Sequence, residues 1–221
     1  MMTAEAPRAA ILGRAELRRH RGADQIMGMP AINRRRWTSP DVRALLDESR
    51  HWPRYELLHG ELLVTPAPRI VHQEAIARLH VVLHDYCEGE RAGIALISPS
   101  DIELAPETIM QPDVFVIPLE LAHLDTVEWP DVHRLLLAVE VLSPSSLHQD
   151  RVLKREFYLD HGVEEYWIVD LDGRLFERWT PLAPTPDVRR DVLTWHPAGA
   201  GTPFALDVAA FFSSLKLLRR G

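Results

Sequence analysis

The sequence predicts an α/β protein, and three observations support that fold class. Residues 135–142 form a nearly continuous apolar run, interrupted only by Glu140 and followed by Ser143-Pro144, which is typical of a strand covered on both faces of a sheet. Segments with the apolar spacing of an amphipathic helix alternate with short strand-like segments along the chain. A length of 221 residues is sufficient for one α/β domain with its own core.

The composition indicates a soluble protein of a reducing compartment. Hydrophobic residues make up 46% and charged residues 26% of the chain, and no apolar run approaches the roughly 18 residues of a membrane span. Residues 1–30 lack the apolar core of a signal peptide. The single Cys87 excludes an internal disulfide and a multi-cysteine zinc site. We therefore expect a cytoplasmic protein with no membrane partner.

Charge is distributed unevenly along the chain. The net charge of -7 argues against a broadly basic surface, but residues 1–36 contain eight Arg and only three acidic residues. The same segment shows no sustained hydrophobic period, so we expect a basic, disordered N-terminal arm at residues 1–36. Residues 37–221 are then expected to form a single domain, because no second domain boundary is visible in them.

The first elements of that domain follow from capping and turn signals. Thr38 and Asp41 have the spacing of a capping box, which predicts a helix that ends before Trp52-Pro53. Residues 55–64 read as two short strands joined by a tight turn at His59-Gly60. Apolar residues at 3- and 4-residue spacing then predict a helix from about residue 70 to 86, stopped at Gly89.

The second half of the domain reads as strands with two further helices. Helices are expected at about residues 147–161, closed by Gly162, and near the end of the chain, after a short strand, within residues 204–218. The remaining strands are expected at residues 94–97, 101–104, 111–117, 135–142, 164–170, 174–179 and 188–195.

Two carboxylates suggest chemistry at the end of the buried strand. Glu140 lies within the strand, where a carboxylate costs several kcal/mol unless it is paired or bound to a cation. It is therefore either part of a structural ion pair or a metal ligand. Asp113 heads another strand, and if the two strands pair, both carboxylates can converge on one cation. Mg²⁺ prefers such oxygen ligands, together with water and a backbone carbonyl such as that of Val141.

Lys154 stands out because lysine is rare in this chain. Lys occurs only at Lys154 and Lys216, and the other 23 of the 25 basic residues are Arg. Asp150 and Lys154 share a helix face at i and i+4, and the turn at Ser143-Pro144 would fold that face back towards Glu140. Lys154 could then orient or help to deprotonate a water, or neutralise charge on a phosphate. An ordinary surface pair with Asp150 is the alternative.

These residues resemble a known family. Gln111-Pro112-Asp113, the run 139–145, Asp150 with Lys154, and residues 162–170 are similar in order and spacing to the Uma-type restriction endonucleases of the PD-(D/E)XK superfamily, over about residues 37–179. The resemblance implies a restriction-endonuclease-like mixed β-sheet flanked by helices. It also implies hydrolysis of DNA phosphodiester bonds that depends on Mg²⁺, with Mn²⁺ as a possible substitute.

The resemblance also assigns roles to residues. It implies that Asp113 and Glu140 are metal ligands and that Lys154 is the catalytic lysine. Glu61 matches an acidic position often found near such sites, and Asp101 matches the strand before the metal-binding aspartate, which makes it a further candidate ligand. In the general superfamily pattern the lysine follows the glutamate by two residues, a position that is Leu142 here. We therefore expect Lys154 to supply the ammonium group from the helix.

Other functions stay open at this point. The fold could bind nucleic acid or a protein without cleaving it, or Asp113 and Glu140 could serve another hydrolase as an acid and base pair. A zinc site at His72, His80 and His84 is disfavoured, because no His-Glu-x-x-His string is present and solvated helix histidines explain the spacing. A homodimer could form, since double-strand cleavage often uses two sites. Candidates for a local phosphate-binding patch are Arg69, Arg78, Arg151 and Arg155.

Overall fold

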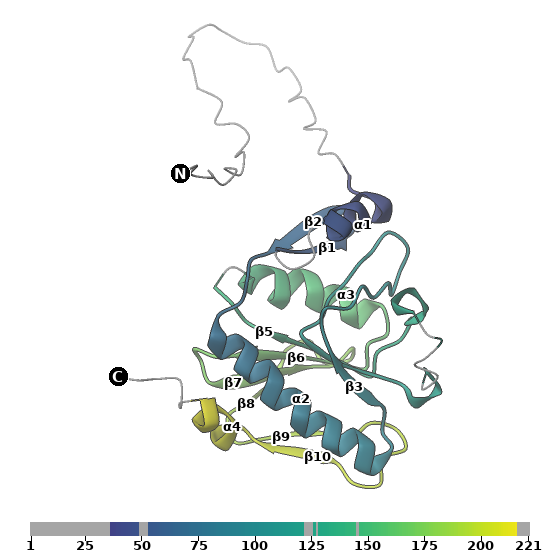
Figure 1. The fold of residues 1–221 in the computed structure, drawn as a ribbon. Coiled ribbons are helices and arrows are strands. Elements are labelled where there is room, and N and C mark those ends of the chain that lie inside the picture. Colours follow the sequence, from purple (N-terminus) through teal and green to yellow (C-terminus); the bar gives the residue numbers. More distant parts are fainter. Residues whose placement is uncertain (1–35, 49–52, 122–125, 127, 145, 216–221) are drawn as a thin grey trace, which may run out of the picture. The chain divides into compact units, whose positions relative to one another are not determined.

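The computed structural model describes residues 36–48, 53–121, 126, 128–144 and 146–215 (Figure 1). The predicted N-terminal arm, apart from Arg36, lies outside the described residues. Residues 216–221, which include the last three residues of the segment predicted to end in a helix, also lie outside them. Among the residues that are described, no helix is long and apolar enough to cross a membrane.

A six-stranded mixed sheet forms the centre of the fold (Figure 1). Its strands lie in the order β3-β4-β5-β6-β7-β8; β5 and β6 pair in parallel, and every other neighbouring pair is antiparallel. The mixed sheet with flanking helices agrees with the predicted fold class. The strands are β3 (Ile94–Ile97), β4 (Val114–Ile117), β5 (Leu137–Val141), β6 (Glu165–Asp170), β7 (Leu175–Trp179) and β8 (Asp187–Arg189).

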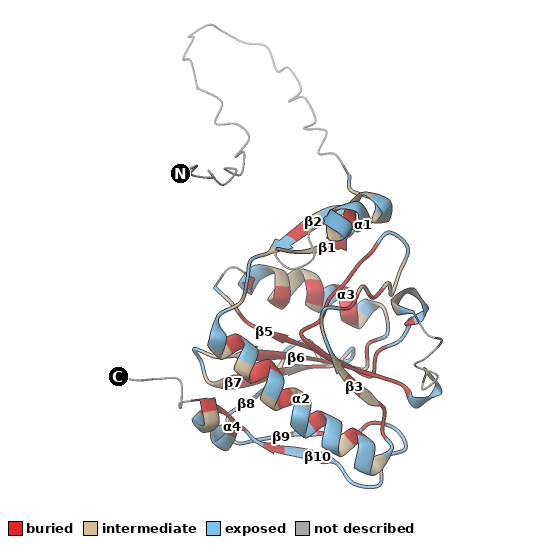
Figure 2. Cartoon of the chain, viewed as in Figure 1, coloured by how far each residue is buried: buried red, intermediate tan, exposed pale blue. Residues whose placement is uncertain are grey.

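Both faces of the central strands are covered, and the period of two along β5 decides what each side chain meets. Val139 and Val141 pack in the apolar cluster on the face of α2 (Ile70–Glu90), which also holds β9 (Val192–Trp195), β10 (Phe204–Asp207) and α4 (Val208–Ser214). Ala138 packs in the opposite cluster, with α3 (Arg155–Asp160). Figure 2 shows the central strands buried between these layers. Glu140 alternates with the two valines and therefore faces the side of α3.

The hairpin β1 (Arg54–Leu58) and β2 (Glu61–Thr65) lies beside α1 (Ser39–Glu48). Val42, Leu57 and Ile109 form a small apolar cluster that joins them. The tight turn is present as predicted: His59 and Gly60 have φ values of 52° and 79°, as a two-residue hairpin of type I′ requires.

The structure differs from the predicted elements in three places outside the site. The helix α2 does not stop at Gly89: it runs to Glu90 and ends where Arg91 takes a left-handed conformation, because Cys87 in the same turn packs into the core. Residues 101–104 form no strand, only a bridge from Ile102 to Met110. The predicted strand 188–195 is divided, since β8 joins the central sheet and β9 pairs with β10.

Candidate functional site

A cavity of about 230 Å³ lies at the carboxyl end of β5. Its walls come from the β1–β2 hairpin, the first turn of α2, the end of β5 and the π-helical turn η3 (Gln149–Lys154). The polar and charged side chains that line it are Arg54, Glu56, Thr65, Arg69, His72, Gln111, Asp113, Glu140, Ser143, Ser146, Asp150 and Lys154.

Glu140 is the last residue but one of β5 and is buried, with an exposed fraction of 3%. Its Oε1 atom accepts hydrogen bonds from Nζ of Lys154 at 3.0 Å and from the hydroxyl of Tyr158 at 3.4 Å. Burial, together with the negative charges of Asp113, Asp150 and Glu56, raises the pKa of Glu140 well above its usual value, although Lys154 opposes the shift. The strand prediction therefore placed this carboxylate correctly, in a setting that disfavours its charge.

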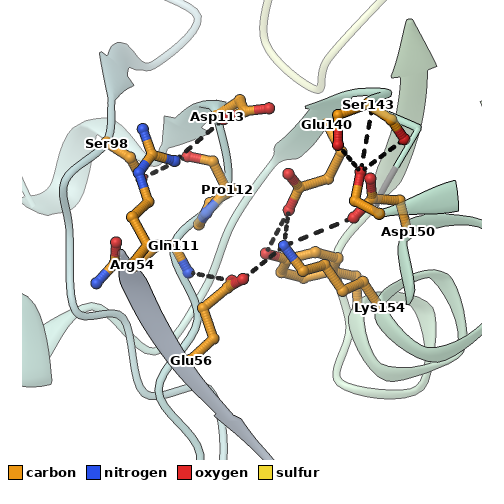
Figure 3. Close-up of polar contacts among 12 residues, drawn as sticks. Arg54, Glu56, Ser98, Gln111, Pro112, Asp113, Glu140, Ser143, Asp150 and Lys154 are labelled. Carbon is orange, nitrogen blue, oxygen red and sulfur yellow. Dashed lines mark hydrogen bonds and ion pairs between the residues drawn. The ribbon is translucent and has the colours of Figure 1, made fainter. Parts of the chain in front are cut away.

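Lys154 connects three carboxylates (Figure 3). Its Nζ atom lies 2.8 Å from Glu56, 3.0 Å from Glu140 and 3.7 Å from Asp150. Burial alone would lower the pKa of Lys154, but the three carboxylates outweigh it and hold the pKa well above the usual value. The ammonium group therefore stays charged at neutral pH.

The backbone that carries Lys154 is not the α-helix that the sequence predicts. Gln149–Lys154 form a π-helical turn, and the α-helix begins only at Arg155. Such insertions are frequent at functional sites, because they rotate a side chain out of regular helical register. Here the turn buries both Asp150 and Lys154, with Asp150 2% exposed.

Asp113 comes directly before β4 and faces a different set of partners. Its Oδ1 lies 3.1 Å from the guanidinium of Arg54, and its Oδ2 lies 3.3 Å from Nε2 of His72 and accepts the backbone N–H of Val141 at 2.9 Å. Burial by itself would raise the pKa of Asp113, but these three partners outweigh burial and keep the pKa below its usual value. Asp113 is therefore held as a carboxylate.

Asp150 is the second carboxyl group whose charge is disfavoured. Burial raises its pKa to about 6, against the attraction of Lys154 and a hydrogen bond with Ser146. Its Oδ1 atom is buried and makes no hydrogen bond within the described part of the chain.

Sequence reasoning missed Glu56. This residue of β1 is 2% exposed, pairs with Lys154 and accepts the backbone N–H of Gln111 at 2.8 Å. The signal was available, because Glu56 stands inside a short apolar strand in the same way as Glu140 does. Its closeness to Lys154 could not be read from the sequence, since the two residues are far apart along the chain.

Two predicted site residues do not reach the cavity. Glu61 is exposed at the start of β2, and Asp101 accepts a hydrogen bond from the side chain of Gln111 at 2.8 Å. Neither residue lines the cavity, so the structure does not bring them together with Asp113, Glu140 and Lys154. Position along the hairpin explains the first case: Glu61 lies opposite Leu58 at the turn, whereas Glu56 lies opposite Leu63, further from the turn. Val141 does line the cavity, next to Glu140.

The three histidines do not gather into a zinc site. His72 contacts Asp113, whereas Nε2 of His80 lies 3.1 Å from the carbonyl oxygen of Ala95 and that of His84 lies 3.7 Å from Glu88. His72 is also buried, so the expectation of solvated helix histidines was wrong for this residue. Within the described ranges, no three His, Cys, Asp or Glu side chains form a ready-made metal centre.

The donor set nevertheless suits a hard divalent cation. Glu56, Asp113, Glu140 and Asp150 are four buried carboxyl groups, and Arg54 and Lys154 are the Arg and Lys side chains that pair with them among the described residues. Both hydrogen bonds to Glu140 seen among the described residues end on Oε1, which leaves Oε2 for another partner. An excess of carboxylate oxygens around a cavity is the chemistry that Mg²⁺ or Mn²⁺ prefers, with water in the remaining positions.

Comparisons with known proteins show the family and support the fold. Residues 40–195 match the model of the Uma2 family, described as "Putative restriction endonuclease". The fold is similar to a crystal structure from Anabaena variabilis ATCC 29413, described as a putative nuclease belonging to DUF820, with a TM-score of 0.64 and 19% identity over 79% of this chain and 98% of that chain. No curated protein matches the chain. Since the family model spans well over half of the 221 residues, the chain belongs to the Uma2 family of nuclease-type proteins.

Proposed function

We propose that the protein is a divalent-metal-dependent endonuclease that hydrolyses DNA phosphodiester bonds. The observation that carries the proposal is the convergence of Asp113, Glu140 and Lys154 on one cavity, from two strands and a π-helical turn. Membership of a nuclease-type family supports the reaction class.

Asp113 and Glu140 would hold the metal ion, and the backbone carbonyl of Val141 is a third candidate ligand. When bound, Mg²⁺ or Mn²⁺ lowers the pKa of water and offsets negative charge that develops on a phosphate. Asp113 is prepared for this role, because Arg54, His72 and the N–H of Val141 already keep its carboxylate charged. Glu140 would bind in the deprotonated form, and its raised pKa means that a metal ion competes with a proton for this carboxyl group.

The charge of Lys154 narrows its proposed role. A lysine whose pKa is raised well above the usual value is a poor general base at neutral pH. It can instead donate hydrogen bonds and offset charge on the phosphate as the attacking oxygen approaches. Glu56 and Asp150 would keep its ammonium group in place, from 2.8 Å and 3.7 Å.

A second function, binding without cleavage, is favoured by one observation. Lys154 already occupies Oε1 of Glu140, and the described residues contain no ready-made metal centre. If a metal ion cannot displace Lys154 from Glu140, the cavity remains a buried ion-pair cluster and the fold serves as a binding module.

We also propose a cellular setting and an assembly. Cys87 is buried and unpaired, which fits a reducing compartment such as the cytoplasm. A homodimer would bring two cavities to the two strands of a duplex.

Cleavage of supercoiled plasmid tests the proposal. The wild type should nick or linearise DNA with Mg²⁺ or Mn²⁺ and not with EDTA, and Glu140→Ala and Lys154→Ala should each abolish cleavage. Glu61→Ala is the matched control, because it removes an acid of the same hairpin that lies outside the cavity. Absence of cleavage by folded wild type on single-stranded and double-stranded DNA would favour the binding module.

A further inference from the structure

One wall of the cavity carries the positive charge of Arg69, and His72 on the same wall contacts the carboxylate of Asp113. Thr65, Pro66, Ala67, Pro68, Arg69 and His72 form that wall, at the entry into α2. Arg69 is exposed, whereas Lys154 is only 4% exposed. The difference in burial places Arg69 at the mouth of the cavity and Lys154 at its floor. The two cations can therefore contact different groups of one bound molecule.

Arg69 differs from the other arginines that the sequence suggests for phosphate contact. Arg78 pairs with Glu74, and Arg151 pairs with Asp170 and Glu177. Arg155 pairs with Glu156 and lies over the ring of Trp179. Arg69 forms no ion pair with any residue that the structure describes, although four carboxyl groups line the same cavity. Its guanidinium is therefore available to an anion from outside the protein.

The first turn of α2 adds to this positive wall. The helix is 21 residues long, its N-cap residue Arg69 provides no side-chain cap, and its first turn contains no acidic residue. The positive end of the helix dipole and the first backbone N–H groups therefore lack a side-chain partner from this turn. Helix N-termini of this kind bind phosphate groups readily.

His72 supplies a second, independent indication at the same turn. The residue is 9% exposed and lines the cavity, and its Nδ1 atom is buried without a hydrogen-bond partner among the described residues. Buried polar atoms are almost always satisfied by protein or by a bound molecule, so this atom at a cavity wall has room for a partner, such as a water that links Nδ1 to a bound phosphate.

We propose that Arg69 and the first turn of α2 form a subsite for a phosphate group of the nucleic acid that neighbours the phosphate to be cleaved. The inference rests on the proposed function, because it takes the carboxylates and Lys154 as the place of cleavage. In a nucleic acid the phosphates are regularly spaced, so one phosphate can lie at Lys154 on the cavity floor while a neighbouring phosphate lies at Arg69 at the mouth. Pro66 and Pro68 restrict the backbone before Arg69, which positions the guanidinium with little loss of freedom on binding.

The salt dependence of binding tests this subsite without reference to cleavage. A fluorescein-labelled 20-base-pair duplex is titrated with wild type, Arg69→Gln and Arg69→Lys in EDTA, between 50 and 200 mM salt. One phosphate contact contributes about 0.9 to the slope of log affinity against log salt, so Arg69→Gln should lose about 3.5-fold less affinity over that range than the wild type. Arg69→Lys should keep the wild-type slope, because it keeps the charge.

Arg78→Gln is the matched control on the same helix, since that side chain is already paired with Glu74. The proposal is overturned if Arg69→Gln keeps the wild-type slope or if Arg78→Gln changes it equally. A duplex that does not bind to the wild type at any salt overturns the subsite as well. A reduced slope in Arg69→Gln without any plasmid cleavage by the wild type would sustain the subsite and refute the nuclease proposal, so the two failures are distinct.

Discussion

Replacement of Lys154 by methionine should destabilise the protein strongly in the absence of metal. The substitution keeps much of the side-chain volume and removes the cation that faces Glu56, Glu140 and Asp150 within 3.7 Å. Removing one partner from a buried ion pair costs about 3–5 kcal/mol, because the remaining charge is left buried and uncompensated. For a domain of this size that loss lowers Tm by about 6–20 °C.

Urea unfolding in EDTA at pH 7.5 measures this effect. Arg43→Met is the control, because Arg43 pairs with Glu103 near the surface and such a pair contributes about 0–1 kcal/mol. The loss in Lys154→Met should shrink at pH 5. Burial has raised the pKa of Glu140 and of Asp150, so at pH 5 these carboxyl groups take up protons and no longer need the ammonium group.

Two results would refute this reasoning. A loss in Lys154→Met no larger than that in Arg43→Met would mean that Lys154 does not compensate the buried carboxylates. A loss of equal size at pH 5 and pH 7.5 would mean that it arises from packing rather than from charge.

Three further outcomes are expected. Without metal, the wild type should gain on the order of 2–3 kcal/mol of unfolding free energy between pH 7.5 and about pH 4.5, because a carboxyl group whose folded pKa is raised to about 6 destabilises the fold above its unfolded pKa. Asp150→Asn should show a smaller gain, and a flat pH profile of the wild type would contradict this. Glu56→Gln should slow plasmid cleavage by about 10-fold or more, as loss of a positioning partner does. Glu61→Gln should leave the cleavage rate unchanged, and equal effects of the two substitutions would mean that Glu56 has no role in the site. The thiol of Cys87 should resist a thiol reagent at pH 8 until urea unfolds the protein, since burial raises its pKa to about 12. Rapid modification of the native protein would contradict this prediction.

The central part of the fold could be predicted because its signals are local. A strand buried on both faces reads as a continuous apolar run, and β5 and β6 were identified in this way. The turn at His59-Gly60 was predicted from residue type alone. The boundaries that were wrong depend on tertiary contacts. Cys87 packs in the core, and α2 therefore continues past Gly89. The strand β8 pairs within the six-stranded sheet, whereas β9 pairs with β10 in a separate sheet.

The site was predicted in part for the same reason. Glu140 was found because a carboxylate inside a buried strand is costly without a partner, and Asp113 was found because it heads a strand that could pair with the strand of Glu140. Glu56 carried the same signal on a shorter strand, and nothing along the chain indicated that it would meet Lys154. The π-helical turn that brings Lys154 to Glu56 and Glu140 departs from regular helix geometry. The i, i+4 spacing of Asp150 and Lys154 does not indicate such a turn.

Calorimetric titration of the folded protein with Mn²⁺ and Mg²⁺ measures whether the cavity binds a divalent cation. The wild type should bind the cation and release protons as it binds, because burial has raised the pKa of Glu140 and a carboxyl ligand binds in its deprotonated form. Glu140→Gln should weaken binding at least about 10-fold, as loss of a ligand does, and Glu61→Gln should bind as the wild type does. Equal binding by wild type and Glu140→Gln, or no binding by either, would contradict the claim that this cavity holds the metal of a nuclease.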